Sequence, residues 1–218
     1  MSSTTSDTKA NQGSDLAKSA AIALQKAFAY SKAIVHDDGH WCGELKSNVI
    51  VTAEYVFLRQ TLGHWQTDTN QEDRESISRW LVSEQNEDGS WALAPSLPGH
   101  ISASVEAYLA LKILGQSCET SEAMQKAQAW ITTVGGGVES VRVFTSVFLA
   151  TFGLMPWSAV PQLPAELILL PALCPINIYT LSSWARSTLI PLLVVCHHQP
   201  IYALPNDKSA DNDFLDEL

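Results

Sequence analysis

The stretch RWLVSEQNEDGSWALAP, Arg79–Pro95, joins the end of an amphipathic helix to a turn that contains glycine and tryptophan. The apolar stripe of that helix ends at Leu81, and an acidic turn with Gly89 and Trp91 follows. A large indole gains nothing in an exposed loop, so this pattern predicts that another part of the fold packs on Trp91.

A second stretch repeats this arrangement. SKAIVHDDGHW, Ser31–Trp41, aligns with LVSEQNEDGSW, Leu81–Trp91, at an offset of fifty residues. Repeats of this length are typical of stacked helical units that share one core. The copies differ where Val35 replaces Gln85. We interpret Gln85 as forming hydrogen bonds with unpaired backbone groups at the end of a neighbouring helix, with the Trp91 ring covering them.

The remaining pattern is also helical, because apolar residues recur at helical spacing and no convincing strand alternation is present. The predicted helices cover Leu16–Ile34, Asn48–Leu62, Arg74–Glu84, Ser102–Leu114, Thr120–Thr133 and Val141–Phe152, with a short one near Ala165–Leu170 and a last one over Leu181–Val195 that bends or restarts at Pro191. The sequence therefore predicts an all-α protein.

Composition excludes several functions. The 218 residues are 46% hydrophobic, enough for one sizeable core or two small ones, and carry a net charge of -10. That charge disfavours a nucleic-acid partner. The four cysteines contain no CxxC motif and predict neither a zinc site nor a disulfide framework. His197-His198 lacks a further ligand at suitable spacing, so no metal site is predicted.

The two ends differ from the middle in composition. Residues 1–14 are polar and we expect disorder there; with no signal peptide, the expected location is the cytoplasm. Residues 15–205 are expected to form the helical domain, and the acidic segment 206–218 a solvated tail or linker stub. The apolar run Leu181–Cys196 is interrupted by Arg186 and a proline, so it does not predict a membrane span.

Six strings in the middle of the chain carry a family resemblance. DGHWCGEL, NVIVTAEYVFL, EQNEDGSWAL, SVEAYLALKILG, SVRVFTSVFLATFGLMPWSAVP and NIYTLSSWARSTLIPLL follow in the order found in squalene-hopene cyclases, and resemble the N-terminal portion of that family. The resemblance implies an incomplete α/α barrel (toroid) of the terpenoid cyclase type, without a cofactor. The turn residues resemble the family's QW repeat: Trp41, Leu81, Gln85, Gly89 and Trp91.

The same resemblance implies site residues. Glu54, Glu106 and Arg142 match residues that polarise a water where the last carbocation is quenched, and Trp184 matches an aromatic residue lining the channel. The residues by themselves leave other interpretations open. A carboxylate in an apolar run needs a partner, so a structural ion pair with Arg142 explains Glu54 equally well. On general grounds, a tryptophan such as Trp184 is more often a core residue than a site residue.

The family's proton donor lies in an Asp-x-Asp-Asp motif of a second barrel, and these 218 residues contain no such motif. The first hypothesis is therefore a cyclase-family protein that holds the termination side of a cavity for a squalene-like isoprenoid. A second polypeptide, or a missing C-terminal half, would supply the acid. The alternative is a non-catalytic truncated helical domain that binds an isoprenoid or a protein partner, or self-associates through an uncovered apolar face.

Two further points stay open in the sequence. Burial could raise the pKa of Glu54 or Glu106 enough to make one of them the acid, but we expect Arg142 to favour the charged carboxylates. Peripheral membrane contact is compatible with the apolar, proline-rich segment Pro156–Pro175, although the negative charge disfavours anionic lipid.

Overall fold

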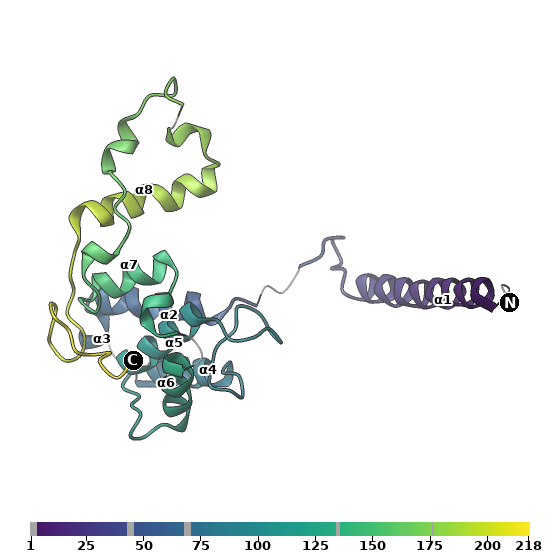
Figure 1. Cartoon of the computed structure of the whole chain (residues 1–218), viewed down its shortest axis with the longest axis horizontal. Coiled ribbons are helices and arrows are strands. Elements are labelled where there is room, and N and C mark those ends of the chain that lie inside the picture. The colour runs from purple at the N-terminus through teal and green to yellow at the C-terminus, as the bar shows by residue number, and fades with distance from the viewer. Residues whose placement is uncertain (1–3, 43–45, 68–70, 134–135, 176) are drawn as a thin grey trace. The chain divides into compact units, whose positions relative to one another are not determined.

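Helices make up all the regular structure in the part of the chain that is described (Figure 1). The computed structural model describes residues 4–42, 46–67, 71–133, 136–175 and 177–218. The chain divides into two compact units, Met1–Lys46 and Ser47–Leu218. The predicted all-α class is therefore confirmed.

The first unit contains one long helix, α1 (Thr4–Ala33), and the turn that follows it. Helix α1 begins at Thr4, within the segment 1–14 for which disorder was expected, and residues 1–3 lie outside the described part of the chain. No proline lies within α1, so its backbone hydrogen bonds can continue toward the N-terminus without interruption.

The second unit holds the other α-helices and four short 3₁₀ helices. The α-helices are α2 (Val49–Thr61), α3 (His64–Thr67), α4 (Gln71–Ser83), α5 (Ile101–Ile113), α6 (Glu122–Thr133), α7 (Val143–Thr151) and α8 (Ser183–His198). The 3₁₀ helices are Val138–Ser140, Trp157–Ala159, Ala165–Leu169 and Ile178–Thr180. The predicted short helix near Ala165 is thus a 3₁₀ helix, and α8 continues through Pro191.

Helix α5 lies at the centre of the core of the second unit. Nearly all of its residues are buried, because apolar and small side chains cover its whole circumference and no single stripe dominates. It packs against α2, α4 and α6. The largest fully buried side chains of this core include Trp91, Tyr108, Phe57 and Phe152.

The two aligned turns, His36–Trp41 and Asn86–Trp91, have the same hydrogen bonds. In each, the N–H of the first residue donates to the carbonyl of the fifth, over 2.9 and 2.8 Å, and the glycine N–H donates back to the first residue's carbonyl. Each indole donates to the carbonyl ten residues earlier, over 2.6 and 2.7 Å. Gly39 and Gly89 have φ of 87° and 90°, where glycine is favoured. The aligned stretches therefore share one local structure.

Gln85 makes a contact that the first copy lacks. Its side-chain amide donates to the carbonyl of Gly89 over 2.8 Å and to that of Ala123, in the first turn of α6, over 2.9 Å. Trp91 is completely buried beside this contact. Val35 has no amide to offer at the equivalent position. The naming of these turns as QW repeats stays a prediction.

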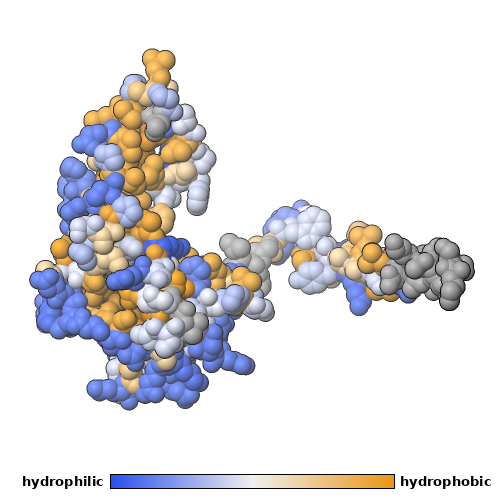
Figure 2. All heavy atoms as spheres, viewed as in Figure 1, coloured by the Kyte–Doolittle hydropathy of each residue, from blue (hydrophilic) through white to orange (hydrophobic). Residues whose placement is uncertain are grey.

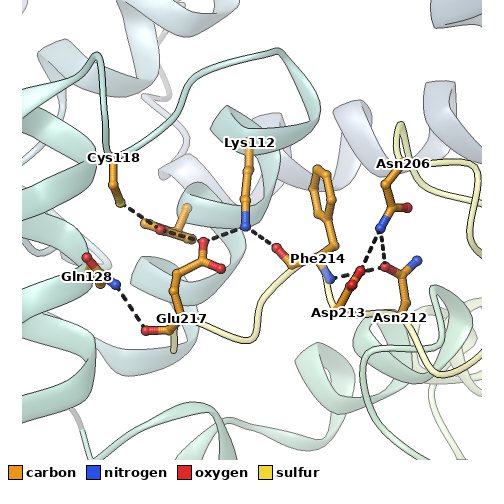
Figure 3. A network of polar contacts seen from close by, with 9 residues as sticks. Lys112, Cys118, Gln128, Asn206, Asn212, Asp213, Phe214 and Glu217 are labelled. Carbon is orange, nitrogen blue, oxygen red and sulfur yellow. Dashed lines mark hydrogen bonds and ion pairs between the residues drawn. The ribbon is translucent and has the colours of Figure 1, made fainter.

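The C-terminal segment packs on the second unit, which differs from the solvated tail or linker stub expected for residues 206–218. Leu215 joins the hydrophobic core. The Lys112 ammonium group donates to both the Glu217 carboxylate and the Phe214 carbonyl, and Tyr108 donates to the same carboxylate over 2.8 Å (Figure 3). Glu217, an acidic residue of this segment, therefore has partners on α5, and composition alone does not reveal such pairing.

The described residues also contain no helix long and apolar enough to cross a membrane.

Replacing Lys112 with methionine tests the contribution of this segment to stability. The change removes two hydrogen bonds to a partly buried carboxylate and a carbonyl, and we expect a loss of about 1–3 kcal/mol in the free energy of unfolding. Urea denaturation followed by circular dichroism measures it. The control, Lys208→Met, breaks a half-exposed ion pair with Asp213 and should cost less than about 1 kcal/mol. Equal small losses would contradict a structural role for the Lys112 contact.

Candidate active site

Three helices bring together two carboxylates and one guanidinium group. Glu54 lies in α2, Glu106 in α5, and Arg142 is the N-cap residue of α7. One nitrogen of Arg142, Nη2, lies 3.3 Å from Oε1 of Glu54 and 3.1 Å from Oε1 of Glu106. The three residues singled out by resemblance therefore form one cluster, although they are far apart in the sequence.

Backbone contacts hold this cluster in place. The Asn48 side chain accepts a hydrogen bond from the N–H of Ile50 over 3.2 Å, which fixes the start of α2. The N–H of Arg142 donates to the Ser102 hydroxyl over 2.9 Å, which joins the start of α7 to the first turn of α5. The position of the guanidinium group thus depends on the packing of α7 against α5.

Sequence reasoning missed Thr145. Its hydroxyl donates to Oε1 of Glu106 and accepts a hydrogen bond from Nε of Arg142 over 3.3 Å. Thr145 is fully buried and follows Arg142 by three residues, so both lie on one face of the start of α7. That spacing is the signal that could have identified it.

Burial controls the charge of the two carboxyl groups. Glu106 is only 1% exposed, and burial raises its pKa to about 7 even though the hydrogen bond from Thr145 and the charge of Arg142 oppose the shift. Burial also raises the pKa of Glu54, again against the charge of Arg142. Arg142 favours the charged form of both carboxyl groups, as expected, but desolvation outweighs its attraction, so the pKa of each is raised.

One atom of the cluster has a free hydrogen-bonding position. Among the described residues, Oε2 of Glu106 has no hydrogen-bond partner, whereas its Oε1 is shared by Arg142 and Thr145. A buried oxygen in this state favours a proton or a water molecule. Because the pKa of Glu106 is near neutral, the cluster can take up or release a proton at physiological pH.

An apolar cavity of about 390 Å³ lies beside the cluster, between α2, α7 and α8. Glu54 is part of its wall. Most of the remaining wall is aromatic or aliphatic, and its rings belong to Phe57, Phe144, Phe148, Phe152 and Tyr202. Phe57 contacts Phe148 and Phe152 at ring-centre distances of 5.5 and 5.8 Å. Such a wall suits an apolar ligand, and its ring faces can stabilise positive charge.

Trp184 does not join this arrangement. It lies near the start of α8, its side chain is 78% exposed, and it is absent from the wall of the cavity beside Glu54. The core alternative for Trp184 is therefore wrong. Its role in lining a substrate channel stays a prediction.

Residues 24–218 match the model of the squalene-hopene cyclase N-terminal domain. The chain belongs to this family. The all-helical fold is accordingly of the family's α/α toroid type.

The chain is similar to part of each of three known cyclases. Enfumafungin synthase of Hormonema carpetanum is 55% identical over 89% of this chain, which corresponds to 14% of that protein. Squalene hopane cyclase of Aspergillus fumigatus is 50% identical over 91% of the chain and 26% of the relative. Squalene–hopene cyclase of Alicyclobacillus acidocaldarius is 44% identical over 84% of this chain, which corresponds to 28% of the relative. The chain thus spans less than a third of the length of each.

The raised pKa of Glu106 predicts a stability that falls as the pH rises. The folded state holds the proton more tightly than the unfolded chain, so this contribution is complete below about pH 4.5 and is lost as the pH passes 7, on the order of 3 kcal/mol in all. Urea denaturation of the natural chain and of Glu106→Gln at pH 5 and pH 8 tests this. The stability of the natural chain relative to the variant should decrease between the two pH values, whereas a constant difference would contradict the prediction.

Proposed function

We propose that this chain forms the termination side of a triterpene cyclase cavity. The observation that carries the proposal is the position of Arg142, which joins Glu54 on the wall of an aromatic cavity to the buried carboxyl of Glu106. An apolar wall suits a squalene-like isoprenoid, and a carboxylate pair of raised pKa suits the removal of a proton at the end of a cation reaction.

The proposed termination step is acid–base chemistry on a carbocation. A water molecule held by the carboxylates attacks the cationic carbon, a C–O bond forms, and the extra proton of that water passes to a carboxylate of the cluster. If instead a carbon next to the cation loses its proton to the cluster, the C–H electron pair forms an alkene. Both endings leave the proton on Glu54 or Glu106, and Arg142 stabilises the negative charge before the transfer.

Initiation requires an acid outside these 218 residues. Protonating an alkene needs a far stronger acid than a carboxyl group whose pKa is about 7, so Glu106 fits the role of proton acceptor. The Asp-x-Asp-Asp motif of the family is absent from this sequence. We therefore propose that the remaining portion of the cyclase, in the same or in a second polypeptide, supplies the acid.

Contact with a lipid surface is a further part of the proposal. The segment from Leu163 to Trp184 exposes large apolar side chains, among them Leu173 at 97%, and Figure 2 shows hydrophobic residues gathered in the upper part of the second unit. An apolar substrate partitions into membranes, so a protein that takes it from a bilayer needs such a surface. The net charge of -10 favours apolar insertion over attraction to anionic lipid.

Isoprenoid binding without chemistry is a second candidate function. The cavity of about 390 Å³ favours binding, because side chains of this chain alone form its walls and no second polypeptide is needed to complete them. Binding alone would need no acid. The two candidates therefore differ in whether added acid-bearing polypeptide produces turnover.

Incubation with squalene, followed by mass spectrometry of the products, separates these candidates. We expect no cyclic product from the purified chain alone. We expect cyclic product after addition of the part of the Aspergillus fumigatus relative that lies beyond the matched region, made as a separate polypeptide. In that mixture Glu54→Gln/Glu106→Gln should lower the yield of cyclic product roughly tenfold, because both endings lose their proton acceptors. Glu119→Gln, at an exposed carboxylate, is the matched control.

Two other results would change this assignment. Cyclic product from the chain alone, absent in the double variant, would show that the cluster itself supplies the acid. Squalene binding without product, even with the added polypeptide bound, would favour the second candidate.

A further inference from the structure

The cavity beside Glu54 has two different ends. Glu54 meets Arg142 near the starts of α2 and α7, over 3.3 Å. Phe57 contacts Phe148 further along both helices, at a ring-centre distance of 5.5 Å. Because these contacts follow the same order along both helices, the helices run in the same direction. The cavity therefore extends from the carboxyl group of Glu54 toward the last residue of α7, Thr151, which also lines it.

Tyr202 is held at the second end of this cavity. The segment that follows α8, yellow in Figure 1, returns to the ends of α2 and α7. The N–H of Tyr202 donates over 2.8 Å to the carbonyl of Thr151, one of the carbonyls that a helix end leaves without a partner. The carbonyl of the next residue, Ala203, accepts a hydrogen bond over 2.9 Å from the side-chain amide of Gln60, near the end of α2. The backbone on both sides of Tyr202 is thus tied to the two helix ends, which fixes its side chain in the wall of the cavity.

The burial of Gln60 needs an explanation. Its side chain is only 5% exposed, and a buried amide is costly unless it forms hydrogen bonds. A leucine would fill similar space without that cost, so packing alone does not account for a glutamine here. Its hydrogen bond reaches a carbonyl 143 residues away in the sequence, and Leu204, which directly follows that carbonyl, is fully buried. The amide of Gln60 therefore serves to hold the segment that carries Tyr202.

The depth of the cavity follows from α2. Glu54 and Thr61, the last residue of α2, both line the cavity and lie seven residues apart, which corresponds to about 10 Å along a helix. Phe57 and Leu58 line the cavity between them. An extended geraniol molecule spans a similar length and could place its hydroxyl group at Glu54. A cavity of this depth takes one short end of a squalene-like chain and not the whole of it.

We propose that Tyr202 limits the depth of this cavity and so determines how long an isoprenoid end can lie against Glu54, and that Gln60 is the positioning residue that holds Tyr202 in place. The ring of Tyr202 meets the end of a ligand that extends from Glu54 along α2 and α7. The inference rests on the proposed function, because it names the part of the isoprenoid that this cavity accepts.

Calorimetric titration of the full chain with geraniol, farnesol and geranylgeraniol tests the depth limit, because each alcohol is one isoprene unit longer than the one before. Burial of an added unit normally strengthens binding. In the natural chain we expect farnesol and geranylgeraniol to bind no more tightly than geraniol, because Tyr202 leaves no room for the added units. Tyr202→Ala should lower the Kd for farnesol several-fold relative to that for geraniol.

Two tyrosine variants serve as controls. Tyr202→Phe keeps the ring and should keep the preference of the natural chain. Tyr179→Ala removes a tyrosine that is 57% exposed and is not among the residues lining the cavity, so it should leave all three Kd values unchanged. Tyr202 is itself 38% exposed, so its truncation leaves no closed void, and circular dichroism confirms that each variant is folded.

Gln60→Leu tests the positioning role. The change removes the amide but keeps a side chain of similar size, so the segment that carries Tyr202 is held less firmly. We expect the ratio of the Kd for farnesol to that for geraniol to fall, by less than in Tyr202→Ala. The control is Gln125→Leu, which removes an amide-to-carbonyl bond of 2.6 Å at an exposed position of α6. A Gln60→Leu chain that is less stable but has an unchanged ratio would refute the positioning role.

Three results would overturn the depth limit itself. They are an unchanged Kd ratio in Tyr202→Ala, binding by the natural chain that strengthens steadily with the length of the alcohol, and no binding of any of the alcohols. The proposed function fails separately. A changed ratio in Tyr202→Ala without squalene turnover in the mixture with the added polypeptide would refute only the proposed function, and turnover with an unchanged ratio would refute only the role of Tyr202.

Discussion

The burial of α5 on every side is the constraint on which the second unit depends. A helix in this position must be covered by its neighbours, and α2, α4 and α6 do so. It also carries Glu106 into the core, where a charged carboxylate is costly unless it is paired. The core and the candidate active site are therefore one structure, since the contacts that satisfy Glu106 also hold α7 against α5.

Arg142 resolves this conflict only in part. One guanidinium nitrogen serves two carboxyl groups, and desolvation still raises the pKa of both. A purely structural ion pair would be expected to keep its carboxylate charged. A cluster that holds a proton near neutral pH, beside an aromatic cavity, is better suited to proton exchange.

The two turns share one local structure. Hydrogen bonds within the turn, from the glycine and the indole, are the same in both copies because they depend only on nearby residues. Coverage of the indole depends on a distant helix, and only the second turn has α6 upon it. In the second turn this local structure closes the core.

The amino-acid sequence by itself determined the helical class, the position of most helices and the shared form of the two turns, because these follow from short-range spacing and from glycine and tryptophan at set positions. Resemblance to a family added Glu54, Glu106 and Arg142. Only the tertiary structure showed that the pKa of both carboxyl groups is raised, because desolvation depends on what surrounds a carboxyl group and not on its neighbours in sequence. It also brought in Thr145, left Trp184 exposed, and tied the acidic C-terminal segment to Lys112, through contacts between residues that lie far apart in the chain.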